Sequence, residues 1–126
     1  MNSMSRGFKD LNVYNLAFET AMEIFHLTKT FPQDEKYSLT DQIRRSSRSV
    51  CANIAEGYRK RIYPKHFTSK MTDADAEASE TIVWLDFAYN CNYINEQIKI
   101  KLKSKYEEVG RMLWSMIKNP EKFLPK

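Results

Sequence analysis

The chain has 126 residues and a formal net charge of +4, which suits one domain with its own core and is too short for two. With only three glycines and four prolines, it favours long helices with few turns and excludes a sandwich or barrel. This mild basicity permits nucleic-acid binding but does not establish it.

A first helix is predicted after Asp10, which is expected to be its N-cap, and residues 1–7 are expected to form a loose tail before it. Apolar residues at helical spacing run from Tyr14 to Phe31 and form a face wider than one partner helix needs. Phe31-Pro32 should end this helix, because the residue before a proline disfavours helical geometry.

A second helix is predicted from Ser38, as N-cap, to about Tyr58. Gly57 either signals its end or lies inside it where another backbone comes close. Its residues form three stripes. The apolar stripe consists of Leu39, Ile43, Ser47, Val50 and Ile54. The polar stripe consists of Gln42, Ser46, Ser49, Asn53 and Glu56. The basic stripe consists of Arg44, Arg48, Cys51, Ala55 and Arg59.

A third helix is expected to have Pro64 in its first turn. Its apolar positions follow heptad-like spacing: Phe67, Met71, Ala74, Ala78, Thr81, Leu85 and Ala88. After a break over residues 90–93, Asn95 is expected to cap a fourth helix. Residues 98–103 alternate like a strand, but apolar positions continue at helical spacing to Met116, so we predict a helix that Asn119-Pro120 ends.

Four helices joined by short connections predict an all-α fold, an antiparallel up-down-up-down four-helix bundle. We expect a single domain over residues 1–126, with loose tails over 1–7 and 120–126. Two cysteines without zinc-ligand spacing favour reduced thiols. The absence of an apolar leader or of a membrane-length apolar run favours a cytoplasmic protein with no membrane partner.

Charge is segregated along the chain. Residues 36–65 carry eight basic side chains against two acidic ones, whereas residues 66–96 carry one lysine against six acids. The second helix is therefore basic and the third is acidic.

Several segments resemble a known family. They are Phe8-Lys9-Asp10-Leu11, Glu35-x-Tyr37-x-Leu39-x-x-Gln42-Ile43-Arg44-Arg45 and Ser49-Val50-x-Ala52-Asn53-Ile54-Ala55-Glu56-Gly57. The chain resembles, over nearly its whole length, the bacterial four-helix bundle proteins encoded by 23S rRNA intervening sequences, which are related to the accessory variability proteins of diversity-generating retroelements. In the third helix, Ala76-Glu77 stands where that family has Gly-Ser.

The resemblance implies a four-helix bundle that assembles into a homo-oligomeric ring, typically a pentamer. It also implies a positive surface suited to RNA or to an RNA-bound protein partner such as a reverse transcriptase. The family has no established catalytic activity.

The candidate nucleic-acid-binding residues are basic side chains of the second helix and the turn after it: Arg44, Arg45, Arg48, Arg59, Lys60, Arg61 and Lys65. Guanidinium groups bind phosphate oxygens, and released counterions strengthen binding. Of these, residues 59–61 are expected to stay free of partners. The alternative is that these cations pair with the acidic third helix. A second basic patch consists of Lys99, Lys101, Lys103 and Lys105, for which a solvated face is the favoured interpretation.

Part of the polar stripe has two interpretations, a ligand site or a buried hydrogen-bonded contact that fixes helix register, and we favour the second. The residues concerned are Gln42, Ser49, Asn53 and Glu56. A carboxylate in such a contact needs a cation, which Arg45 or an arginine of a neighbouring subunit would supply.

No catalytic or cofactor motif occurs in the sequence. Asp73, Glu77 and Glu80 share a helical face but lack the histidine of a di-metal motif, so we expect no metal, no cofactor and no enzyme activity. The sequence favours a non-catalytic oligomer that binds RNA or an RNA–protein complex through the second helix. The alternative is an interaction scaffold whose charge segregation serves self-assembly alone.

Overall fold

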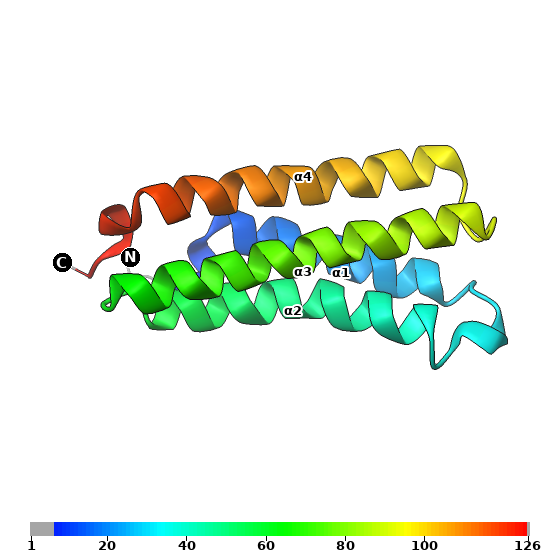
Figure 1. Ribbon diagram of the computed structural model, residues 1–126, viewed down its shortest axis with the longest axis horizontal. Helices are drawn as coiled ribbons and strands as arrows, with labels where there is room; N and C mark the ends of the chain where they lie inside the picture. Colours follow the sequence, from blue (N-terminus) through cyan, green and yellow to red (C-terminus); the bar gives the residue numbers. More distant parts are fainter. Residues whose placement is uncertain (1–6, 126) are drawn as a thin grey trace, which may run out of the picture.

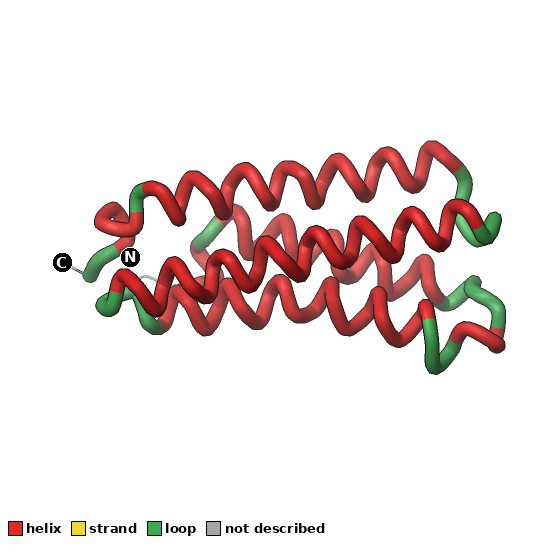
Figure 2. Tube along the Cα trace, viewed as in Figure 1, coloured by secondary structure: helices red, strands yellow, loops and turns green. Residues whose placement is uncertain are grey.

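The computed structural model describes residues 7–125 and consists of four long helices arranged as an antiparallel bundle (Figure 1). They are α1 (Asn12–Thr28), α2 (Leu39–Arg59), α3 (Pro64–Asn90) and α4 (Glu96–Lys118). The short 3₁₀ turns η1 (Gly7–Asp10), η2 (Gln33–Glu35) and η3 (Pro120–Phe123) flank them. No strand occurs between residues 7 and 125 (Figure 2), and the predicted four-helix bundle is confirmed.

Both ends of α1 differ from the prediction. The helix begins at Asn12 after Leu11, and Asp10 belongs to η1 instead of capping it. It ends at Thr28, before the Phe31-Pro32 pair, and the N–H groups of the next three residues donate to carbonyls three residues earlier, as in a 3₁₀ turn. Apart from Gly7, the predicted N-terminal tail lies outside the described residues.

The first turn of α2 is capped by a carboxylate that lies before it. Ser38 occupies the predicted N-cap position, but its hydroxyl donates to Glu35 Oε1 at 2.5 Å. The Leu39 N–H donates to the same oxygen at 3.2 Å. Glu35 also accepts a hydrogen bond of 2.7 Å from the Tyr93 hydroxyl in the α3–α4 connection, so it joins two loops of the bundle.

The predicted starts of α3 and α4 are confirmed. Pro64 occupies the first turn of α3, where its missing N–H is not needed. Asn95 caps α4 by accepting a hydrogen bond of 2.8 Å from Ile98 N–H. The connection between the two helices includes Asn92 at φ 64°, a left-handed conformation that asparagine tolerates.

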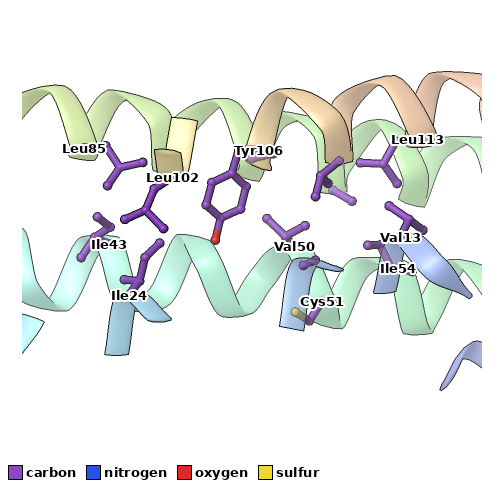
Figure 3. Close-up of a cluster of buried hydrophobic side chains, with 14 of the residues drawn as sticks. Val13, Ile24, Ile43, Val50, Cys51, Ile54, Leu85, Leu102, Tyr106 and Leu113 are labelled. Atoms are coloured by element: carbon purple, nitrogen blue, oxygen red, sulfur yellow. The ribbon is translucent and has the colours of Figure 1, made fainter. Parts of the chain in front are cut away.

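The core runs along the inside of all four helices (Figure 3). One layer takes Ile24, Ile43, Leu85 and Leu102, a residue from each helix, and all are almost completely buried. The predicted apolar stripe of α2 and all seven apolar positions predicted for α3 are buried. On α4, Leu102, Tyr106, Val109, Leu113 and Met116 are buried, so the helical interpretation of the alternating segment is confirmed.

The end of the chain is partly structured, in contrast to the predicted loose tail over 120–126. Pro120–Phe123 form η3, and the Phe123 ring stacks on the Phe67 ring with centroids 5.5 Å apart. This contact covers the end of the core between α3 and α4. None of the helices described over residues 7–125 is long and apolar enough to cross a membrane.

Candidate nucleic-acid interface

The structure divides the seven predicted basic residues among three places. Arg44 and Arg48 lie on the side of α2 that contacts α1, and Arg45 lies on the side that faces α3. The other four, Arg59, Lys60, Arg61 and Lys65, surround the α2–α3 connection. Fifteen helical residues span roughly 22 Å, so Arg44 and Arg59 lie far apart along α2.

The Phe25 ring of α1 collects three cations. Arg44 and Arg48 place their guanidinium carbons 4.9 and 5.8 Å from the ring centroid, and Lys29 places its ammonium 4.7 Å from it. Arg44 Nε also donates to Thr28 Oγ1 at 2.8 Å. We call Phe25, Lys29, Arg44 and Arg48 the Phe25 cluster.

The spacing of residues in the sequence explains how the Phe25 cluster forms. Phe25 and Lys29 are four residues apart on α1, as Arg44 and Arg48 are on α2, so each pair shares a helical face. Between residues 7 and 125, no carboxylate lies within ion-pair distance of these three cations. Lys29 and Arg48 are exposed, so the cluster presents positive charge to solvent.

Arg45 has a different environment. It forms an ion pair of 3.8 Å with Asp41, one turn earlier on its own helix. It also lines a polar cavity of about 200 Å³ between α2 and α3, together with Glu77 and Glu80. Burial, together with the carboxyl groups of Glu80 and Asp73, raises the pKa of Glu77, and Arg45 opposes this shift.

Lys70 supplies the cation of the polar stripe, a role that we expected of Arg45 or of an arginine of a neighbouring subunit. Its ammonium lies 2.9 Å from Glu56 and 3.4 Å from the Asn53 amide oxygen, and Asn53 also donates to Ser49 O at 2.9 Å. The hydrogen bond from Lys70 lowers the pKa of Glu56 and raises that of Lys70.

The polar stripe is only partly buried. The Ser46 hydroxyl is buried and lies 2.8 Å from that of Thr81 on α3. Gln42 is exposed, and the Glu56 side chain is 56% exposed. The stripe therefore joins α2 to α3 as expected of a register-fixing contact, but the prediction that it is buried is wrong at these two residues.

The cations near the α2–α3 connection are mostly exposed. Arg61 is the exception, because its guanidinium stacks 4.0 Å from the Tyr58 ring centroid and donates to Tyr58 O at 3.0 Å. Arg59, Lys60 and Lys65 are exposed. Within residues 7–125 none of the four forms an ion pair with a carboxylate, so Arg61 is held by Tyr58 and not by the acidic side chains of α3.

The lysine patch on α4 is partly neutralised. Lys101 and Lys105 both pair with Glu23 of α1, the first at 3.2 Å. Burial raises the pKa of Glu23, but the hydrogen bonds from the two lysines outweigh it and lower the pKa overall. The Lys99 ammonium lies 4.4 Å from the Tyr89 ring centroid. This patch offers less free charge than the Phe25 cluster.

No group of three or more histidine, cysteine, aspartate or glutamate side chains suited to a metal ion occurs within residues 7–125. His26 lies against the Phe25 ring and His66 against the Tyr63 ring. On α2, the Ser46 hydroxyl bonds to Ile43 O and to the Thr81 hydroxyl, and the Ser47 hydroxyl donates to Arg44 O.

Sequence reasoning did not single out Phe25 and Lys29. Their spacing of four residues was available as a signal, because an aromatic ring and a cation at this distance meet on a helix. Arg44 and Arg48 were predicted, but their common support on one ring depends on which helix packs beside the basic stripe.

The family described as "23S rRNA-intervening sequence protein" matches residues 9–115 of the chain. Among solved structures, the chain is similar to a protein of unknown function from the S23 ribosomal protein family of Bacteroides thetaiotaomicron. The two are 30% identical with a TM-score of 0.76, and the match covers 84% of this chain and 95% of that one. No curated protein matches the chain.

Proposed function

Because the chain belongs to the family of 23S rRNA-intervening sequence proteins, we propose that it is a non-catalytic bundle that binds RNA, or an RNA–protein complex, through basic residues of α2. The observation that carries the proposal is the Phe25 cluster, in which α1 and α2 gather three cations on one ring and none of them pairs with a carboxylate of residues 7–125. Location in the cytoplasm and a reverse-transcriptase-like partner are further parts of the proposal.

The chemistry of the cluster suits a phosphate backbone. Guanidinium groups donate paired hydrogen bonds to phosphate oxygens. Stacking on Phe25, and the bond from Arg44 to Thr28, restrict the arginines before any ligand arrives. Binding then costs less side-chain entropy than it would with freely moving arginines.

A pair of charge-reversal variants tests the location of the surface. Lys29→Glu combined with Arg48→Glu removes two exposed cations of the Phe25 cluster. Arg59→Glu combined with Lys60→Glu makes the same change in charge near the opposite end of α2. Binding of a structured RNA is measured by fluorescence anisotropy over a range of salt concentrations, with helix content checked by circular dichroism.

We expect the first variant to bind about tenfold more weakly at low salt and to reduce the slope of log affinity against log salt by about two, one for each lost phosphate contact. The matched variant should change both quantities less. If the matched variant is affected more strongly, the surface lies at the α2–α3 connection. If the unaltered protein does not bind RNA at low salt, the RNA proposal fails.

A second candidate function is self-assembly without RNA binding, and an apolar groove of about 400 Å³ between η1, α1 and α2 favours it. Phe18 and Met22 line this groove and are about half exposed. Exposed apolar surface of this kind marks interaction sites. A pentamer is implied by the family resemblance alone and stays a prediction.

A further inference from the structure

A second feature of the basic face is a polar pocket of about 190 Å³ between the end of α1 and the start of α2. We propose that this pocket binds a terminal phosphate group, carried by the end of an RNA strand or by a nucleotide. The proposal rests on the proposed function in that RNA is the expected source of the phosphate, while the pocket itself is argued from its own residues.

Three cations line the pocket: Lys29, Lys36 and Arg44. Within residues 7–125 none of them lies within ion-pair distance of a carboxylate. The ammonium of Lys36 lies 5.3 Å from the Tyr37 ring centroid, and Arg44 is held by Thr28. A phosphodiester inside an RNA strand carries a single negative charge, less than the three positive charges of the pocket. A terminal phosphate monoester carries about −1.5 to −2 at neutral pH and therefore matches them better.

Thr40 supplies an independent observation. Its side chain lines the pocket and is only 7% exposed, yet its hydroxyl forms no hydrogen bond with any described residue. Among the described residues the buried side-chain atoms without a partner are Trp84 Nε1 and Tyr106 Oη, so the Thr40 hydroxyl still reaches the open pocket and is available to hydrogen-bond a ligand oxygen there. Thr40 also lies in the first turn of α2, where the helix dipole favours an anion.

The carboxylate and carbonyl groups near the pocket, which would repel an anion, are hydrogen-bonded to other residues. Glu35 is held by Ser38, Leu39 and Tyr93 and does not line the pocket. At the end of α1, the carbonyls of Phe25, His26 and Leu27 accept hydrogen bonds from the residues of the following turn.

The volume of the pocket indicates which chemical group it can hold. The pocket is smaller than the roughly 300 Å³ at which sites for drug-sized molecules begin, and Phe31 and Pro32 contribute its apolar lining. A compact phosphate fits this space better than a base or a sugar. Lys29 and Arg44 also belong to the Phe25 cluster, so a strand whose end lies in the pocket would continue over that cluster.

The test compares RNA strands of one sequence with a phosphate at the 5′ end, at the 3′ end or at neither end. Each is measured with the unaltered protein, with Lys36→Glu, with Thr40→Val and with Lys118→Glu. Lys118→Glu makes the same charge change at an exposed lysine at the opposite end of the bundle, outside every proposed binding surface. We expect one phosphorylated strand to bind about tenfold more tightly than the unphosphorylated one, since hydrogen bonds to a charged group have this strength.

Lys36→Glu should abolish this difference, Thr40→Val should reduce it, and Lys118→Glu should preserve it. If all three strands bind equally well, the terminal-phosphate proposal is overturned while the proposed RNA binding stands. If no strand binds, the proposed function fails. Titration with a nucleoside monophosphate then tests separately whether the pocket binds a phosphate group. A shift of the Thr40 amide resonance that Lys36→Glu abolishes would support a nucleotide ligand, and the absence of a shift would overturn the proposal.

Discussion

Gly57 lies inside α2 where this helix approaches α3 most closely, which is one of the two positions that the sequence left open. A Cβ added there would lie 2.6 Å from Met71 Cε and 2.9 Å from Lys70 Cβ. The methionine end can move, but Lys70 Cβ is attached to the backbone of α3. Any larger residue must therefore push the two helices apart, at the turn where Lys70 pairs with Glu56.

We expect Gly57→Ala to lower the free energy of unfolding by about 1–3 kcal/mol through overpacking, although alanine favours a helix by about 1 kcal/mol. Gly110→Ala is the matched control, because its Cβ would meet only a side-chain oxygen, Asp75 Oδ1 at 3.3 Å, which needs to move by only a few tenths of an ångström. That change should be neutral or stabilising by up to about 1 kcal/mol. Urea unfolding followed by circular dichroism measures both, and equal effects would contradict the close helix contact.

The elements themselves were largely predictable from periodicity. The apolar positions of α3 and α4 follow helical spacing over several turns, and burial of those positions dominates any local preference, including the strand-like run at 98–103. Helix ends were less predictable because side chains from elsewhere decide them. Glu35 caps α2 in place of Ser38, and Tyr93, which helps to hold it, lies 58 residues away in sequence.

The candidate interface could likewise be predicted from the sequence only in part. The stripe of Arg44 and Arg48 follows from helical spacing alone, and so does the Phe25–Lys29 pair. Whether the basic stripe lies beside α1 or α3 depends on the handedness of the bundle, which periodicity does not encode. The structure places it beside α1, so Arg44 and Arg48 stack on Phe25 instead of pairing with the acids of α3.

The cap of α2 predicts a pH dependence of stability. Hydrogen bonds from Ser38, Tyr93 and the Leu39 N–H lower the pKa of Glu35 in the folded protein. A lowered pKa means that the unfolded chain binds this proton more readily. The stabilisation is therefore present above the unfolded value of about 4.3 and is lost as the pH falls through the folded value.

We expect Glu35→Gln to lower stability at neutral pH and to have a smaller effect at acid pH, below the unfolded value of about 4.3, because protonation of the glutamate removes the same stabilisation as the substitution. The control is Asp34→Asn, which makes the same charge change at an exposed side chain of η2 and should have little effect at either pH. Urea unfolding at the two pH values gives the difference. A loss of stability that is the same at both pH values would show that the carboxylate is not the stabilising group.

At the scale of the whole molecule, the basic, acidic and apolar surfaces lie on different helices. The Phe25 cluster is basic and lies between α1 and α2, whereas Asp73, Glu77 and Glu80 make part of α3 acidic. Among the exposed apolar side chains, Phe18 and Met22 lie together on α1, and Val83 and Phe87 lie together on α3. Contacts between unlike patches are heterologous and close into rings when the rotation allows it.

These patches lead us to expect an assembly larger than a monomer, which light scattering at micromolar concentration measures. Phe18→Glu should shift the protein toward the monomer without loss of helix content, because it places a charge beside the apolar groove where Phe18 is 49% exposed. Ile62→Glu is the matched control, since Ile62 is also exposed but lies in the α2–α3 connection, away from the groove. It should leave the assembly unchanged. A monomeric unaltered protein would refute self-assembly, and it would leave RNA binding by the Phe25 cluster to be judged by its salt dependence alone.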